Sequence, residues 1–148
     1  MTGQLLHTLH GSTIPASALA FSPDSRLLFF GGLAFPGFYG GHVYFVDSQT
    51  GTDQGKLETP GGVTALAVSP DGKILASGGD DQTIHLWSLP EKTELASWKA
   101  HDSRVLVLTF SPDNRSLVSG SADGTIRIWD VLFIKAGLAK LGFELAMT

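Results

Sequence analysis

The feature that most constrains this chain is a short pattern that occurs three times. A Ser-Pro-Asp turn begins at Ser22, Ser69 and Ser111, so its copies are 47 and 42 residues apart. An apolar strand that ends in tryptophan recurs at Trp87 and Trp129 with the same spacing of 42 residues. Two independent markers at one spacing indicate a repeat architecture, in which each repeat buries its apolar face against its neighbours.

Each repeat predicts four short strands. In the last copy, the apolar stretch 105–110 precedes the Ser-Pro-Asp turn, 117–120 follows it, and Ala-Asp-Gly separates that segment from 125–129. Proline, asparagine and glycine at these positions favour tight turns. In the middle copy, 94–98 supplies a fourth strand. Helical periodicity is absent from the repeats, so the sequence predicts an all-β array.

Composition narrows the classes of function. The chain has 148 residues, no cysteine and a net charge of −4. Without cysteine there are no disulfides, no thiolate metal sites and no cysteine nucleophile. The weak negative charge and the lack of basic runs argue against nucleic-acid binding. No apolar stretch approaches the length of about 18 residues that a membrane span needs. We therefore predict a cytoplasmic protein that binds no cofactor, no metal, no nucleic acid and no membrane.

The repeat period, the serine-proline-aspartate turns and the Trp-Asp ending at Trp129-Asp130 resemble the WD40 repeat family of β-propellers. The resemblance covers about residues 5–131 and implies four-stranded blades that stack face to face. It predicts a partial propeller with blades at about 10–58, 59–100 and 101–131. Residues 4–9 are interpreted as a strand left over from a preceding blade.

Three blades are too few for a closed ring, which has 4–8. The chain is then part of a longer propeller, a subunit that completes a ring by association, or an open solenoid. Both terminal blades are expected to leave an apolar face uncovered, which favours self-association through those faces.

The resemblance also implies a hydrogen-bonded tetrad of His, Ser, Asp and Trp with a structural role. In such a relay, the aspartate accepts from the imidazole, which connects to the hydroxyl and then to the indole N–H. The second repeat has threonine, Thr59, where the histidine is expected, and the first has Val46 in place of the tryptophan. The predicted tetrad residues are His101, Ser119, Asp123 and Trp129 in the third repeat, and Ser77, Asp81 and Trp87 in the second.

The first repeat carries a longer, glycine-rich loop at 31–41, between its second and third strands. Three aromatic residues in this loop form either a contact patch for a partner or a plug packed on a neighbouring blade. In the resembling family, this face is the one used most often for partners. The predicted contact residues are Phe35, Phe38, Tyr39, Asp80 and Arg104.

The tail, 132–148, departs from the repeat pattern. Ile134, Leu138, Leu141 and Leu145 follow a helical spacing and predict a short amphipathic helix. This helix either caps an open sheet edge or enters a partner's groove; alternatively, the tail has no selected structure.

The sequence contains no catalytic motif. No histidine has metal-binding spacing, and His85, inside a predicted strand, is interpreted as a packed residue. The favoured function is a non-catalytic scaffold that binds other proteins or peptides. The alternative is a regulatory or sensor portion of a larger enzyme whose catalytic domain is encoded elsewhere. The third hypothesis is an enzyme at the centre of an oligomeric propeller.

Overall fold

A computed structural model describes residues 3–9, 15–33 and 40–140. The first of its three antiparallel sheets has four strands, each paired with the next along the chain. The strands of this sheet are β1 (Ala16–Phe21), β2 (Leu27–Gly32), β3 (Gly41–Asp47) and β4 (Asp53–Thr59).

The second sheet repeats this arrangement, and the third stops after three strands. The second sheet consists of β5 (Val63–Val68), β6 (Ile74–Gly79), β7 (Thr83–Ser88) and β8 (Thr93–Lys99). The third consists of β9 (Val105–Phe110), β10 (Ser116–Ser121) and β11 (Ile126–Asp130). The predicted all-β partial propeller with three blades is therefore confirmed, and the third blade lacks a fourth strand within the described residues.

The Ser-Pro-Asp turns explain why the pattern repeats. In the second sheet, the Ser69 hydroxyl donates to Asp71 Oδ1 at 2.6 Å, and the same oxygen accepts the Lys73 amide at 3.0 Å. The Ile74 amide donates to Ser69 Oγ at 3.0 Å. Gly72 adopts a φ of 72°, which glycine reaches without strain. These local bonds satisfy the backbone between β5 and β6 and set the hairpin's register.

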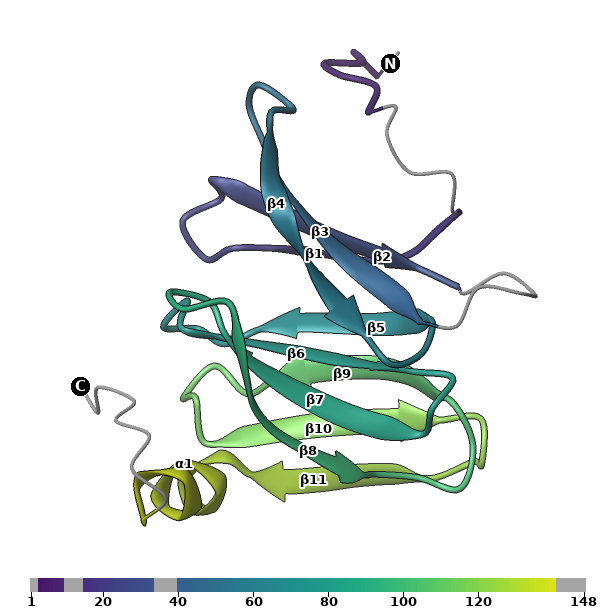
Figure 1. Ribbon diagram of the computed structural model, residues 1–148, viewed down its shortest axis with the longest axis vertical. Helices are drawn as coiled ribbons and strands as arrows, with labels where there is room; N and C mark the ends of the chain where they lie inside the picture. Colours follow the sequence, from purple (N-terminus) through teal and green to yellow (C-terminus); the bar gives the residue numbers. More distant parts are fainter. Residues whose placement is uncertain (1–2, 10–14, 34–39, 141–148) are drawn as a thin grey trace.

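The three sheets stack in chain order, with the second between the first and the third (Figure 1). The core between the first and second sheets contains Phe29, Val43 and Leu75, all fully buried. The core between the second and third contains Ile84 and Leu117, which are also fully buried. Because the second sheet is covered on both faces, its strands show little polar alternation.

The first strand of each following sheet lies close to a glycine on the second strand of the sheet before it, at two equivalent positions. A Cβ atom added to Gly31 on β2 would lie 2.8 Å from Val63 Cβ on β5. A Cβ added to Gly78 on β6 would lie 2.9 Å from Val105 Cβ on β9. Neither valine Cβ can move without its backbone, so glycine is needed where one sheet stacks on the next.

The chain turns into a helix where a fourth strand of the third sheet would begin. The helix α1 (Val131–Lys140) starts directly after β11, and Asp130 Oδ1 accepts the Phe133 amide at 2.9 Å as its cap. Val131 and Leu138 are buried in the core between the second and third sheets. The predicted tail helix is thus confirmed over these residues, while the predicted Leu141 and Leu145 lie outside the described residues.

Residues 3–9 form no strand in this structure, and their leucines are exposed. The interpretation of 4–9 as a strand left over from a preceding blade stays a prediction, because the described sheets do not include that blade. A strand needs a neighbouring edge to satisfy its backbone, and no described sheet pairs with this segment.

We expect Gly78→Ala to lower the free energy of unfolding by about 1–3 kcal/mol, because the new methyl group forces β6 and β9 apart. Urea unfolding followed by tryptophan fluorescence measures this change. Gly137→Ala is the matched control, since Gly137 lies in α1 with nothing within 4 Å of an added Cβ. That substitution should stabilise the protein by up to about 1 kcal/mol. Equal effects of the two substitutions would contradict the close-approach argument.

Candidate functional site

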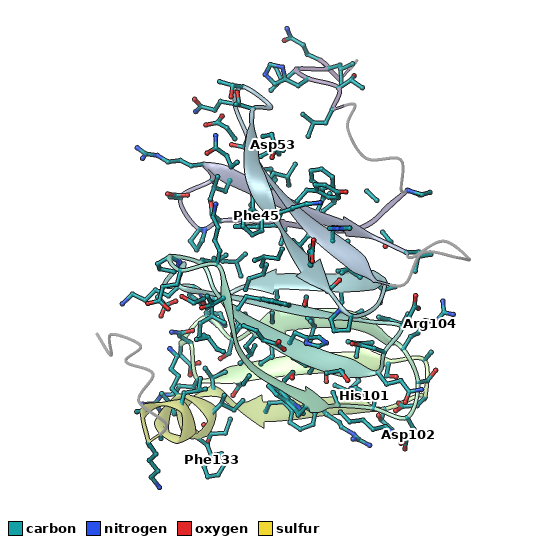
Figure 2. The ribbon with its side chains drawn as sticks, in the orientation of Figure 1. Phe45, Asp53, His101, Asp102, Arg104 and Phe133 are labelled. Carbon is teal, nitrogen blue, oxygen red and sulfur yellow. The ribbon has the colours of Figure 1, made fainter. Side chains whose placement is uncertain are left out.

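The third sheet places its four tetrad residues in one continuous hydrogen-bonded chain. His101 precedes β9, Ser119 lies on β10, Asp123 lies in the β10–β11 turn, and Trp129 lies on β11. His101 Nε2 is 2.7 Å from Ser119 Oγ, and His101 Nδ1 is 3.1 Å from Asp123 Oδ2. Trp129 Nε1 donates to Ser119 Oγ at 2.9 Å. The four residues come from two loops and two strands, so these hydrogen bonds connect the elements at one end of the sheet, where Figure 2 shows His101.

Asp123 is the most strongly bonded member of this tetrad. Its Oδ1 accepts the hydroxyl of Thr125 at 2.6 Å and its Oδ2 accepts the amide of Asp102 at 3.0 Å. The Thr125 hydroxyl, followed by the Asp102 amide, holds the pKa of Asp123 well below its usual range.

The order Ser119, His101, Asp123 matches the order of hydrogen bonds in a serine hydrolase triad, but access differs. Ser119 is fully buried, and its oxygen already accepts the indole N–H of Trp129. A nucleophilic serine must reach a substrate carbonyl with its oxygen. The hydrogen bonds of the tetrad connect the β8–β9 loop with the β10–β11 loop.

In the second sheet, the aspartate of the tetrad contacts a histidine from a different position in the chain. Trp87 Nε1 donates to Ser77 Oγ at 2.9 Å, as in the third sheet. Thr59 is turned to the Gly61 carbonyl, at 2.8 Å, and does not reach Asp81. Instead, Asp81 Oδ2 lies 2.7 Å from Nε2 of His85, which is on β7.

Glu94 on β8 completes this second network. Its Oε1 lies 2.8 Å from His85 Nδ1, so both ring nitrogens face carboxylates. Sequence reasoning placed His85 in a packed strand and missed this role. A signal was present: the second repeat keeps Asp81, lacks the usual histidine, and has another histidine four residues later.

Burial of His85 by itself would lower its pKa, since it removes water from the imidazolium. The hydrogen bonds to Asp81 and Glu94 outweigh that effect and raise the pKa of His85 above its ordinary value. For Asp81, burial alone would raise the pKa, and the bond to His85 outweighs it and lowers the pKa. The pair is thus a charged imidazolium–carboxylate contact near pH 6.

Two predicted contact residues meet on the surface. Asp80 follows β6, Arg104 precedes β9, and Arg104 Nε lies 3.7 Å from Asp80 Oδ1. Both side chains remain substantially exposed, and Arg104 lies at the loop end of the strands with His101 and Asp102 (Figure 2). The other three predicted contact residues, Phe35, Phe38 and Tyr39, lie outside the described residues.

Other chemistry finds little support in the described part of the chain. Residues 3–9, 15–33 and 40–140 contain no cluster of three histidine or acidic side chains able to hold a metal ion. The same segments include no helix with the length and hydropathy of a membrane span.

Comparisons with known proteins agree with this geometry. The family model described as "WD domain, G-beta repeat" matches residues 3–34, 48–88 and 92–130. The small ribosomal subunit protein RACK1 of Schizosaccharomyces pombe is 52% identical over 40 residues, which cover 27% of this chain and 13% of that protein. Human striatin is 41% identical over 64 residues, covering 40% of this chain and 8% of striatin. The chain thus matches only a small part of each of these relatives.

Solved structures show the same fold. The WD40 repeats of RRP9 superpose with a TM-score of 0.73 at 23% identity, over 84% of this chain and 38% of that one. The structure of U3-55K gives a TM-score of 0.75 at 23% identity, with the same coverage.

We expect Ser119→Ala to lower the free energy of unfolding by about 1–3 kcal/mol, because the His101 ring nitrogen and the Trp129 N–H both lose their hydrogen-bond partner. Thermal unfolding followed by circular dichroism measures the loss. Ser97→Ala, at an exposed position on β8, is the matched control and should change little. Indistinguishable melting curves for the two variants would show that the relay does not hold the sheet.

The His85 network predicts a pH-dependent stability. A raised pKa in the folded state means that protonation of His85 stabilises the fold fully below about pH 6.5, and that this contribution is lost as pH rises through the raised pKa. The difference in unfolding free energy between the native chain and His85→Gln should therefore be largest near about pH 6 and shrink towards about pH 9. Urea titrations across this range test it, with His42→Gln, on β3 of the first sheet, as control. A difference that stays constant with pH would exclude a charged His85.

Proposed function

Because the chain belongs to the WD40 repeat family, we propose that it is a non-catalytic scaffold that binds other proteins or peptides through the loops at the Arg104 end of its sheets. The observation that carries the proposal is a contrast between two kinds of polar group. Beneath these loops, Ser119 and His101 are buried and fully engaged with each other. Within the loops themselves, Asp80 and Arg104 are exposed.

The exposed charges suit protein recognition. Arginine is enriched among the residues that dominate interface energies, and exposed charge pairs contribute to specificity more than to folding. A second exposed pair, Lys99 with Asp102 at 3.4 Å, lies beside the first on the β8–β9 connection. The two pairs present both signs of charge at the same end of the sheets, which favours a partner with a complementary charge pattern.

The named relatives support an assembly role. The relative from Schizosaccharomyces pombe is by name a protein of the small ribosomal subunit, and another similar protein, from rice, is named as U3 snoRNP-associated. The first name describes a protein of a ribosomal subunit, and the second a likeness to a protein that associates with a snoRNP. A chain built from the same repeats is suited to the same general task, although its own partner differs with its loop sequences.

A charge swap separates binding from folding. We expect Arg104→Asp to reduce capture of partners, measured by quantitative affinity purification and mass spectrometry, at least about tenfold, equivalent to about 1.4 kcal/mol. The double variant Asp80→Arg/Arg104→Asp restores the internal pair with its signs exchanged, so it should fold normally and still fail to bind. Arg115→Asp is the control, since Arg115 lies in the β9–β10 turn at the other end of the third sheet. Unchanged capture by the swapped variant would overturn the proposal.

A further inference from the structure

The third sheet ends at a strand edge that no described residue occupies. β11 pairs with β10 on one side, and no fourth strand pairs with its other side. In the second sheet, β8 fills the corresponding place by pairing with β7. α1 follows the end of β11 and does not run along its edge (Figure 1). The outer N–H and C=O groups of β11 are therefore available to another strand.

The face of the third sheet that points away from the second is apolar and exposed. Ile126 and Ile128 on β11 are 76% and 73% exposed. Their counterparts on β7, Ile84 and Leu86, are at most 1% exposed, because the third sheet covers them. The third sheet thus presents the surface that the second sheet uses for stacking, without a sheet to cover it.

Residues 3–9 have the sequence of the missing strand. Leu6 and Leu9 precede β1 by the same number of residues by which Leu95 and Trp98 precede β9. In β8, Leu95 and Trp98 pack on the core between the second and third sheets. Leu6 and Leu9 have no such core, and Leu6 is 78% exposed. The segment carries the apolar pattern of a fourth strand and is not used as one.

A single molecule cannot join this segment to its own free edge while its sheets stay stacked. A Cβ added to Gly51, between β3 and β4, would lie 2.8 Å from Leu9 Cδ2, so Leu9 lies against the first sheet. The first and third sheets lie on opposite sides of the second (Figure 1). Within the described residues, no segment of the same molecule reaches the edge of β11, and the same segment of a second copy is free to do so.

Donation of the segment would also bring two exposed faces together. In the chain, β8 of the second sheet precedes β9, the first strand of the third sheet, which stacks on the second. Residues 4–9 likewise precede β1, the first strand of the first sheet. The first sheet carries Leu19, which is 64% exposed, whereas its counterparts Leu66 and Leu108 are buried against neighbouring sheets. The first sheet of one copy would therefore cover the third sheet of the other copy. Within a single copy, the third sheet covers the second sheet in the same way.

We propose that two copies of this chain associate head to tail, each donating residues 4–9 as the fourth strand beside β11 of the other. Three sheets from each copy give six, which lies within the 4–8 blades of closed propellers, whereas three copies would exceed it. The two equivalent contacts close a ring in which the exposed faces of the described first and third sheets cover each other. The β7–β8 register, in which Leu86 faces Ala96, places Ile128 of one copy opposite His7 of the other. This assembly rests on the proposed scaffold function, whose loop face it completes, but its test requires no binding partner.

Sedimentation equilibrium of the purified chain at tens of micromolar gives the first test. The native chain should have twice the monomer mass of 15.7 kDa. Leu6→Asp/Leu9→Asp should return it to the monomer mass and weaken association at least a hundredfold, and Ile126→Asp should do the same from the acceptor side. Phe133→Asp is the matched control, since Phe133 on α1 is 78% exposed, like Leu6; it should remain a dimer.

Site-specific cross-linking tests the register. The chain has no cysteine, so single cysteines report without background. A mixture of His7→Cys and Ile128→Cys proteins treated with a short bismaleimide should give a covalent heterodimer. His7→Cys mixed with Ser97→Cys, on the outer edge of the complete second sheet, should give none. A monomeric native chain, association that survives Leu6→Asp/Leu9→Asp, or equal linking to both edges would overturn strand donation. Arg104→Asp should keep the dimer, so failure of the scaffold proposal is seen separately.

Discussion

Face-to-face stacking of small sheets is the constraint on which the rest of this structure depends. A single four-stranded sheet of this size has two apolar faces and cannot bury both by itself. Within the described residues, the second sheet is the one with both faces covered, and it holds fully buried residues on each side, such as Leu75 and Ile84. Fully burying a side chain of this kind contributes about 1.5–3 kcal/mol. Stability therefore accumulates at the two interfaces between sheets, and glycines such as Gly78 are needed because those interfaces are tight.

The buried polar networks belong to the loops that connect the stacked sheets. Ser119 and His101 are buried, so their polar atoms need partners inside the protein, and Ser119 also accepts the indole N–H of the partly buried Trp129. The second sheet meets the same requirement by another route, since His85 reaches Asp81 from a strand instead of from the preceding loop. The two arrangements share the tryptophan–serine bond and differ in where the imidazole comes from. In both sheets the aspartate at the turn between the second and third strands bonds an imidazole.

The sequence allowed the repeated parts to be predicted and left the irregular parts open. The strands and turns follow from local chemistry that occurs three times, and the order of the tetrad follows from the resemblance of the third repeat to its family. The contact between His85 and Glu94 depends on the pairing register of β7 and β8, which a pattern within one strand does not contain. Likewise, a strand reading of 4–9 is sound as a pattern, but a pattern cannot supply the neighbouring edge that a strand needs.

The third sheet has three strands and the second has four because α1 begins where a fourth strand would otherwise follow. After β7, Leu89 and the residues that follow form a turn, and the chain returns as β8. After β11, the cap at Asp130 and the burial of Val131 and Leu138 commit the chain to a helix at the end of the strands. Lys135 adds a contact of 3.6 Å to Asp71 in the β5–β6 turn. By covering the ends of the strands, α1 buries its own apolar residues without occupying the side of β11. The helix and an added fourth strand are therefore compatible, because α1 leaves the edge of β11 free and a fourth strand would pair with that edge.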